Sequence, residues 1–303
     1  MRIISVTKGE GASVKIYKYV SPELWDKILK AKQIRFTQPD VFNDPFEMQP
    51  FYESLAEDPG IQKNLNESEF KNVLEELVAE QYPNLPAGVQ NLVPREFLPM
   101  FAELVAPSAV HHAPDLLDGF TQAIRSGFYK GFNEGIGVLA LTEKPDNLLM
   151  WAHYAQNHKG FVIEFDHEHK YFHQQLSPSD ELRYIRKVRY LDKRPNIRIS
   201  TFEDATDIFL TKSKDWKYEE EWRIMRPLQD ATEVITVNGD AIHLFSLPPD
   251  SVTGIIFGCR MSADVKKEII EYLSNEESYS HVNKFDAVLD EREFKLNIVT
   301  TEI

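Results

Sequence analysis

The sequence predicts an α+β fold, with a mixed, mainly antiparallel sheet as its core, flanking helices and one helical insertion. Short apolar segments with alternating or continuous hydrophobic patterns are scattered along the chain, as in Lys15–Val20 and Gly160–Asp166. Helical periodicity is concentrated in other segments. Several predicted strands also follow one another without an intervening helix, which argues against a doubly wound parallel sheet.

The first fifty residues predict strands joined by a helix and ending in a loop. Lys15–Val20 reads as a strand, and a helix opens at Ser21, the N-cap, with Pro22 in its first position. Ile34–Thr37 alternates and predicts a short strand. Gln38–Pro50 contains three prolines and predicts a loop with turn chemistry.

Residues 55–130 differ from the rest and predict a helical insertion within one elaborated domain that spans residues 1–303. Apolar residues in this segment recur at helical spacing, as at Phe70, Val73, Leu74, Leu77 and Val78. Prolines are expected to break the segment into three or four helices at Pro83, Pro86, Pro94, Pro107 and Pro114.

After residue 135 the pattern alternates strands with helices. Strands are expected at Ile136–Thr142, Gly160–Asp166, Val188–Leu191, Trp222–Met225, Glu233–Val237, Ile242–Ser246 and Val252–Gly258, and two more close the chain. Helices are expected at Asn147–Gln156, at Phe202–Lys214, and from the cap Ser262 to Leu273.

Composition limits the function classes. The formal net charge of −14 argues against diffuse binding to a nucleic-acid backbone. One group of basic residues, the basic run, lies close together in sequence and predicts either a solvated charged face or a local basic patch that could contact phosphates. It consists of Arg183, Arg186, Lys187, Arg189, Lys193, Arg194 and Arg198. The single cysteine, Cys259, excludes an internal disulfide and a thiolate zinc site. Without a signal peptide or a long apolar run, we expect a cytoplasmic protein with no membrane partner.

Two segments, Leu141–Asp166 and Trp216–Arg223, combine aromatic residues, carboxylates and cations with strongly apolar residues. Buried charges are costly unless paired, so this mixture indicates either a functional site or an ion-pair network. If the second segment is extended, Glu219 and Glu221 face the same way and can stabilise a developing positive charge. Arg223 shares that face and could instead pair with them.

The helix expected at Asn147–Gln156 carries a second group of candidates. Met150 and Trp151 are expected to enter the core, whereas His153 and Tyr154 could supply polar contacts near a pocket. The alternative for His153 is a histidine with a local structural partner.

We expect no native metal. Several possible ligands are close in sequence, namely His153, His158, Glu164, Asp166, His167 and His169, but no HExxH motif is present. The chain also lacks the GxGxxG, Walker and GxSxG motifs, which argues against Rossmann, P-loop and α/β-hydrolase enzymes.

Four motifs occur together in a fixed order: FNDPFE at Phe42–Glu47, LMWAHYAQNHKGFVIEFD at Leu149–Asp166, WKYEEEWR at Trp216–Arg223 and IIFG at Ile255–Gly258. Together they resemble the bacterial domain-of-unknown-function family 2971, over most of the chain except about residues 55–130. This family implies no established activity.

The order of parts also resembles the ADP-ribosyltransferase superfamily. That resemblance implies NAD as co-substrate, a first strand at Tyr17–Tyr19, a second at Leu141–Glu143 and a third at Tyr218–Glu221. Glu221 or Glu219 would stabilise an oxocarbenium-like transition state. Tyr154 or Trp151 would stack on the nicotinamide. The chain departs from the pattern at Lys18, where an Arg or His is usual and where lysine lacks the planar fork that grips a diphosphate.

The implied enzyme would be NAD-dependent, in the setting of a bacterial effector or defence protein. Residues expected to bind its small-molecule or nucleotide substrate are Tyr17, Tyr19, Asn43, Asp44, Thr142, Trp151, His153, Tyr154, Trp216 and Arg223. One cleft is expected to be lined by Glu221 together with six of them, namely Asn43, Asp44, Trp151, His153, Tyr154 and Trp216.

Two other functions stay open. One is a non-enzymatic sensor module that recognises a nucleotide or a partner through an aromatic pocket. The other is a nuclease-like hydrolase that uses Glu47, Asp166 and Glu219 with a divalent ion. The sequence alone does not decide whether the protein is an enzyme.

Overall fold

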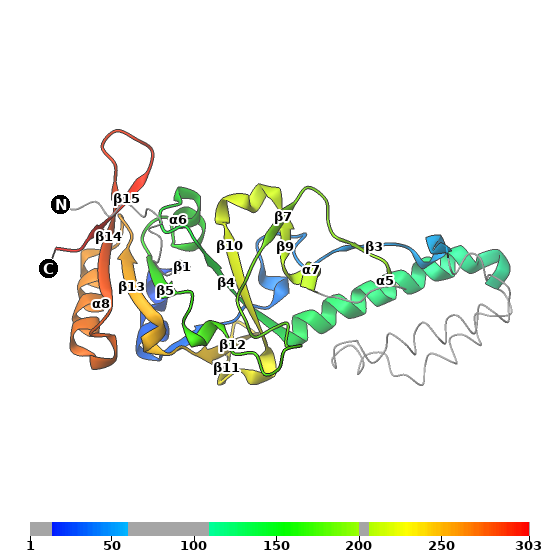
Figure 1. Ribbon diagram of the computed structural model, residues 1–303, viewed down its shortest axis with the longest axis horizontal. Coiled ribbons are helices and arrows are strands. Elements are labelled where there is room, and N and C mark those ends of the chain that lie inside the picture. Colours follow the sequence, from blue (N-terminus) through cyan, green and yellow to red (C-terminus); the bar gives the residue numbers. More distant parts are fainter. Residues whose placement is uncertain (1–13, 60–108, 200–205, 303) are drawn as a thin grey trace. The chain divides into compact units, whose positions relative to one another are not determined.

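An eight-stranded mixed sheet forms the centre of one of two units into which the chain folds (Figure 1). The computed structural model describes residues 14–59, 109–199 and 206–302. The first unit, here called the sheet unit, comprises Met1–Thr37, Val138–Val188 and Asp215–Ile303. The second, called the pocket unit, comprises Gln38–Gly137 and Arg189–Lys214.

The strand order of the large sheet is β15-β14-β13-β5-β1-β4-β10-β6. β13 and β14 are parallel, whereas β1 is antiparallel to β4 and β5, and β13–β5, β14–β15 and β10–β6 are also antiparallel. The α+β prediction with a mainly antiparallel sheet is therefore confirmed. The strands are β1 Lys15–Val20, β4 Ile136–Thr142, β5 Phe161–Asp166, β6 Arg186–Lys187, β10 Glu221–Pro227, β13 Val252–Phe257, β14 Asn283–Leu289 and β15 Leu296–Thr300.

Alternation along the strands gives the large sheet two buried faces. Ile16 and Val20 of β1 belong to one apolar cluster, against which α8 (Ala263–Asn275) packs its buried Ile269 and Leu273. Tyr17 and Tyr19 belong to the cluster on the other face, with Met150 and Trp151 of α6 (Leu148–Tyr154). Cys259 packs half-buried against this second cluster, and burial raises the pKa of its thiol.

Smaller elements complete the sheet unit. β2 (Gln33–Arg35), β11 (Glu233–Val237) and β12 (Asp240–Ser246) form a three-stranded sheet in the order β11-β12-β2. The helix predicted at Ser21 is present in two irregular pieces, a 3-10 turn at Pro22–Leu24 and a π-helix at Asp26–Lys30. Further 3-10 turns are Lys170–Phe172, Lys214–Glu219, Leu228–Asp230, Pro249–Ser251 and Glu277–Tyr279.

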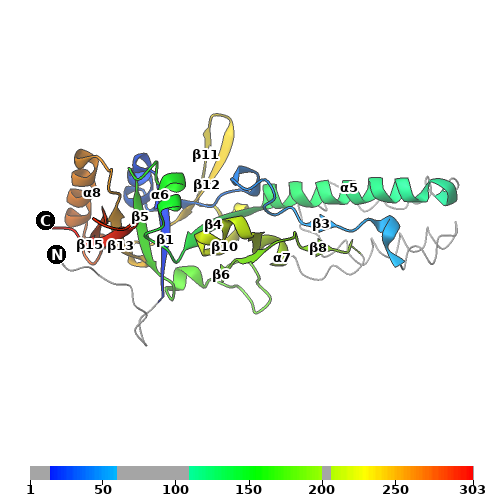
Figure 2. The same ribbon diagram turned by 90° about the horizontal axis from the view of Figure 1, so that it is seen from above.

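The pocket unit contains the helix α5 (Ala109–Gly135), which Figure 2 shows as one continuous element. Its other elements are α7 (Thr206–Phe209), the parallel pair β3 (Phe51–Tyr52) and β8 (Asn196–Ile197), the parallel pair β7 (Arg189–Leu191) and β9 (Thr211–Ser213), and 3-10 turns at Pro39–Val41 and Leu55–Glu57. Aromatic contacts form part of the core: Phe132 meets Phe209 edge-on at 4.8 Å, and Phe128 stacks with Tyr52 at 6.2 Å between ring centroids.

Two details of the predicted helices are wrong. Within the segment Phe202–Lys214, the described part is helical only at Thr206–Phe209, and Thr211–Ser213 instead forms β9, because its backbone pairs with β7. α5 also continues past Pro114, which lies in its second turn and removes one backbone hydrogen bond from a helix of 27 residues.

Most of the predicted helical insertion, residues 60–108, lies outside the described residues. The single-domain arrangement with an insertion at 55–130 therefore stays a prediction. Among the helices of the described ranges, none is long and apolar enough to cross a membrane.

Candidate functional site

The three consecutive glutamates Glu219, Glu220 and Glu221 lie where the chain passes from a 3-10 turn into β10. Glu219 ends the turn Lys214–Glu219, and Glu221 begins the strand. Glu220 between them adopts a left-handed backbone, with φ of 41°. The extended conformation considered for this segment is therefore wrong, since the chain bends at Glu220 and strand alternation does not relate Glu219 to Glu221.

Glu221 forms a bidentate ion pair with Arg223, two residues along the same side of β10. Arg223 donates from Nε to Oε1 at 2.7 Å and from Nη2 to Oε2 at 3.0 Å. Arg223 is fully buried, and Glu221 is 4% exposed. Both carboxylate oxygens of Glu221 thus accept hydrogen bonds from the guanidinium, which matches the ion-pair alternative considered for this strand.

Glu219 is held by side chains from two other elements. Tyr154 of α6 donates its hydroxyl proton to Oε1 of Glu219 at 2.6 Å. Thr142, at the end of β4, donates from Oγ1 to the carbonyl oxygen of Glu219. Asn147, which caps α6, donates from Nδ2 to the carbonyl of Tyr218 at 3.0 Å. The structure therefore brings Thr142, Tyr154 and Glu219 together.

Lys18 of β1 lies in the electrostatic field of both carboxylates. Its ammonium donates to the carbonyl oxygen of Ala140 in β4 at 3.0 Å. Burial lowers the pKa of Lys18 to about 8, although Glu221 and Glu219 act in the opposite direction. We call Lys18, Glu219, Glu221 and Arg223 the charge cluster.

Trp151 and Tyr19, two residues predicted to bind the substrate, are both packed inside the sheet unit. Trp151 is fully buried, donates from Nε1 to the Pro145 carbonyl at 2.8 Å, and meets Tyr19 edge-on at 5.3 Å. Its ring offers no exposed face for stacking on a ligand. Tyr19 donates to the Lys144 carbonyl at 2.6 Å, and burial raises the pKa of its hydroxyl.

The other three sheet-unit candidates are more varied in their surroundings. Tyr17 is buried opposite Thr142 in the β1–β4 pairing, and burial raises its pKa. His153 is exposed on α6, and Trp216 is half-buried with its ring centroid 6.1 Å from that of Tyr218.

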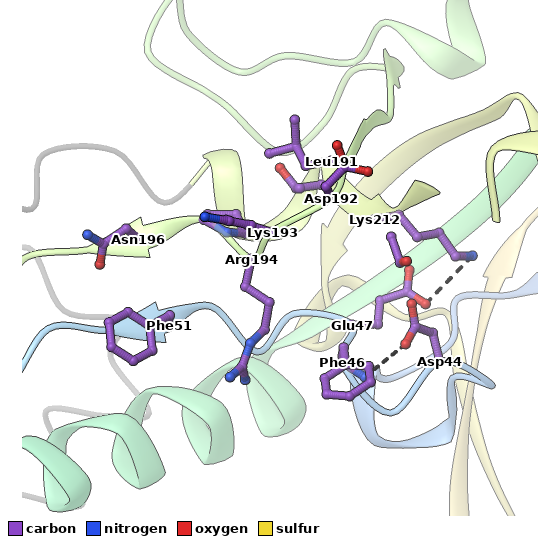
Figure 3. A pocket seen from close by; sticks show the side chains of 13 residues that line it. Asp44, Phe46, Glu47, Phe51, Leu191, Asp192, Lys193, Arg194, Asn196 and Lys212 are labelled. Carbon is purple, nitrogen blue, oxygen red and sulfur yellow. Dashed lines mark hydrogen bonds and ion pairs between the residues drawn. The ribbon is translucent and has the colours of Figure 1, made fainter. Parts of the chain in front are cut away.

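Asn43 and Asp44 belong to the pocket unit, so their convergence with Glu221 in one cleft stays a prediction. Asn43 is exposed, whereas Asp44 lines a pocket of about 580 Å³ within that unit. The pocket lies between the segment that contains Asp44, Phe46 and Glu47, the stretch Leu191–Asn196, and β9 (Figure 3).

Two buried carboxylates of this pocket differ in their partners. Glu47 lies 3.7 Å from the ammonium of Lys212 on β9, and both side chains are buried. Asp44 is 5% exposed; its Oδ1 accepts a hydrogen bond from the backbone N–H of Phe46 at 2.9 Å. Its Oδ2 is buried and has no hydrogen-bond partner among the described residues. Such an atom is costly to keep, which makes it a candidate contact for a ligand.

Exposed aromatic rings and cations form the rim of the pocket. Phe46 is 60% exposed and Phe51 49% exposed. Arg194 places its guanidinium 5.7 Å from the Phe46 ring centroid, and in the view of Figure 3 its side chain lies between the two rings. Lys193 lies next to it and is also exposed.

Sequence reasoning singled out Asp44 but missed Phe46, Phe51, Arg194 and Lys212 as members of one pocket. Two signals were available. Asp44 and Phe46 both lie in the FNDPFE motif, and Arg194 lies in the basic run. The contribution of β9 was hidden, because that segment was predicted to be helical.

Residues 150–224 match the model of a family described as protein of unknown function (DUF2971). The resemblance noted in the sequence is thus confirmed over this segment, which contains most of α6, all of β5 and the whole glutamate run. No curated protein and no solved structure matches the chain.

Proposed function

We propose that the protein is a nucleotide-binding module and that the nucleotide occupies the pocket lined by Asp44, Phe46, Phe51 and Arg194. One observation carries this proposal: exposed rings, exposed cations and a buried carboxylate oxygen without a hydrogen-bond partner among the described residues line the same pocket. A nucleotide offers a matching group for each of them.

The base would stack on Phe46 or Phe51, since both rings leave about half of their surface open to solvent. Stacking of a base on an aromatic side chain contributes roughly 1–3 kcal/mol and depends little on which base is present. The Arg194 guanidinium near the Phe46 ring adds a planar cation that can stack on the base or pair with a phosphate.

The phosphates would contact Arg194 and Lys193, the exposed cations of the rim. Lys212 contributes less, because its ammonium already lies beside the buried Glu47 carboxylate. With a net charge of −14, the chain as a whole repels a long polyanion, so a small nucleotide fits these local cations better than a nucleic acid does.

The ribose would donate a hydroxyl proton to Oδ2 of Asp44. This oxygen carries a desolvation cost in the protein without ligand, and a hydrogen bond from a hydroxyl relieves it. A carboxylate that accepts from ribose hydroxyls is a recurrent device of nucleotide sites.

Calorimetric titration of the full chain with ADP, and separately with NAD, tests the proposal. We expect saturable binding with one ligand per chain, and a Kd raised at least about tenfold in both Phe46→Ala and Arg194→Ala. Phe294→Ala and Arg292→Ala are matched controls, because Phe294 is fully exposed and Arg292 is exposed elsewhere. Absence of saturable binding, or equal weakening by the controls, would overturn the proposal.

A second candidate is NAD-dependent ADP-ribosyl transfer in the sheet unit. What supports it is that the three segments selected by the superfamily resemblance lie in β1, at the end of β4 and at the start of β10, and these strands are consecutive neighbours in the sheet. Of the expected third strand, Tyr218–Glu221, only Glu221 belongs to β10. Glu219 suits the catalytic role better than Glu221, because Arg223 occupies both oxygens of Glu221. Tyr154 would orient the Glu219 carboxylate toward the developing cation.

Release of nicotinamide from NAD is the assay for this candidate. Glu219→Gln should lower turnover at least about a hundredfold, the usual size of losing one preorganised electrostatic group. Glu220→Gln is the matched control, since the neighbouring carboxylate is 38% exposed and lies 3.5 Å from Lys144. If the wild-type protein releases no nicotinamide, the enzyme hypothesis fails while the binding proposal is tested separately by titration.

A further inference from the structure

A group of metal-ligand side chains lies in the sheet unit after the end of β5, on both sides of the turn Lys170–Phe172. His167, Glu168 and His173 each offer one ligand atom, and these atoms lie within 4.8 Å of one another. We propose that the three side chains bind a divalent transition-metal ion, with zinc as the best fit. No metal was expected from the sequence, because it has no HExxH motif and because His173 was not among the candidate ligands.

One ring nitrogen of His173 has the kind of partner that a metal-ligating histidine usually has. Its Nε2 lies 3.0 Å from the carbonyl oxygen of His167. Donation of the Nε2 proton to this carbonyl fixes the tautomer and leaves Nδ1 as the atom with an available lone pair. Ligating histidines typically hold their second nitrogen on a backbone carbonyl in this way.

His167 is positioned by the sheet. Its backbone N–H donates to the Val14 carbonyl at 3.0 Å, and its ring packs edge-on against Trp222, with 4.8 Å between centroids. Nδ1 lies 2.9 Å from a Glu168 carboxylate oxygen. Nε2 is buried and has no hydrogen-bond partner in the described part of the chain. The rings of His167 and His173 are 5.5 Å apart.

The three side chains need to move only a little to coordinate one ion. Four-coordinate zinc with bonds of about 2.1 Å places neighbouring ligand atoms roughly 3.4 Å apart. The backbone N–H of Glu168 is fixed by Asp166 at 3.0 Å, but its side chain is 69% exposed and can rotate. His173 is exposed as well, so these two ligands can approach the more buried His167.

The ligand set selects the class of ion. Two imidazoles and one carboxylate suit zinc and neighbouring transition metals, whereas magnesium and calcium prefer oxygen ligands alone. Three protein ligands leave a fourth position for water, the arrangement of an open zinc site. His169 is closer to His167 in sequence than His173 is, but it is not part of the group. Both of its ring nitrogens have other partners: Nδ1 accepts from the Tyr171 N–H at 3.2 Å, and Nε2 lies 3.4 Å from Asp250.

Zinc titration of the tag-free, chelator-treated full chain by calorimetry tests this site. We expect one zinc ion per chain, and a Kd raised at least about tenfold in His173→Ala and in Glu168→Gln. Cobalt(II) added to the wild type should absorb visible light with the intensity typical of four-coordinate cobalt. In both variants this absorption should be much weaker.

His153→Ala is the matched control, because His153 is an exposed histidine of the same unit outside the group. It should bind zinc as the wild type does. Glu168→Gln changes a surface carboxylate and keeps the test valid even if His173→Ala fails to fold, which circular dichroism would reveal. Absence of stoichiometric zinc binding, or equal affinity in the wild type, His173→Ala and Glu168→Gln, would overturn the proposal and leave only scattered surface binding.

Discussion

Glu219 and Glu221 of the sheet unit and Asp44 of the pocket unit are buried carboxylates with opposite surroundings. In the sheet unit, both oxygens of Glu221 accept hydrogen bonds from the fully buried Arg223, and Tyr154 donates to Glu219. In the pocket unit, one oxygen of Asp44 is buried without a hydrogen-bond partner among the described residues. The carboxylates are 3–5% exposed, so burial alone does not distinguish them.

The difference concerns what each carboxylate does for folding. A buried carboxylate with a bidentate arginine partner stabilises the fold relative to either partner alone, because removing one leaves the other charge uncompensated. A buried oxygen without a partner lowers stability, and such atoms in native proteins have a functional role, a strained setting, or an ordered water or ion as partner. The charge cluster therefore resembles an internal support of the sheet, and the pocket resembles a binding site.

The largest effect is expected for Glu221→Gln. The amide cannot form the bidentate ion pair, so the fully buried Arg223 keeps a charge without its counterion. We expect the free energy of unfolding to fall by roughly 3–5 kcal/mol, the scale of a broken buried pair. Denaturant unfolding of variant and wild type measures it.

Glu220→Gln separates this effect from any change within the glutamate run. Its side chain is 38% exposed and lies 3.5 Å from Lys144, so stability should change by less than about 1 kcal/mol. If Glu221→Gln were as mild as Glu220→Gln, the charge cluster would not support the sheet.

Tyr154→Phe should have the next largest effect. It removes a 2.6 Å hydrogen bond from a hydroxyl to the Glu219 carboxylate while keeping the ring. Hydrogen bonds to charged groups contribute about 1.5–3 kcal/mol, and a loss of that size is expected in chemical denaturation. An unchanged midpoint would mean that Glu219 finds an equally good donor, and the contrast with Asp44 would then rest on Glu221 alone.

The sequence predicted the fold better than the site, for a physical reason. Period-two alternation and helical periodicity are local signals: Lys15–Val20 is a strand with the predicted bounds, and the helix expected from Asn147 begins there, where the Asn147 side chain accepts from the N–H groups of Leu149 and Met150. The helix expected up to Lys214 was wrong at β9, because pairing with β7 is a long-range interaction.

The geometry of the candidate sites depends instead on local bends and turns of the backbone. The glutamate run stands out in the sequence, yet its geometry depends on the bend at Glu220, a backbone conformation that the residue type does not indicate. The His167–His173 contact likewise depends on the turn at Lys170–Phe172, which folds the chain back between them.

The pH dependence of stability, compared between the wild type and Lys18→Met, tests the charge cluster. Burial lowers the folded-state pKa of Lys18 to about 8, whereas an unfolded lysine titrates near about 10.4. Between these values the unfolded chain binds the extra proton, so stability rises with pH. Relative to Lys18→Met, the wild type should gain roughly 1–2 kcal/mol from about pH 7.5 to 9.5. If the difference in stability between the wild type and Lys18→Met did not change with pH, Lys18 would be in contact with solvent.

The smallest change in stability, and the one of opposite sign, is expected for Asp44→Asn. The substitution is the same chemical step as Glu221→Gln, since a carboxylate becomes an amide of nearly equal volume. Here the amide oxygen can still accept from the Phe46 N–H, while the charge that lacks full compensation is removed. Stability should stay unchanged or rise by up to about 1 kcal/mol. The amide nitrogen then faces the pocket as a donor where an acceptor stood, so the Kd for ADP should rise at least about tenfold. Unfolding and titration on one protein sample measure both quantities. A loss of stability comparable to that of Glu221→Gln would show that Asp44 supports the fold, and the contrast between the two units would fail.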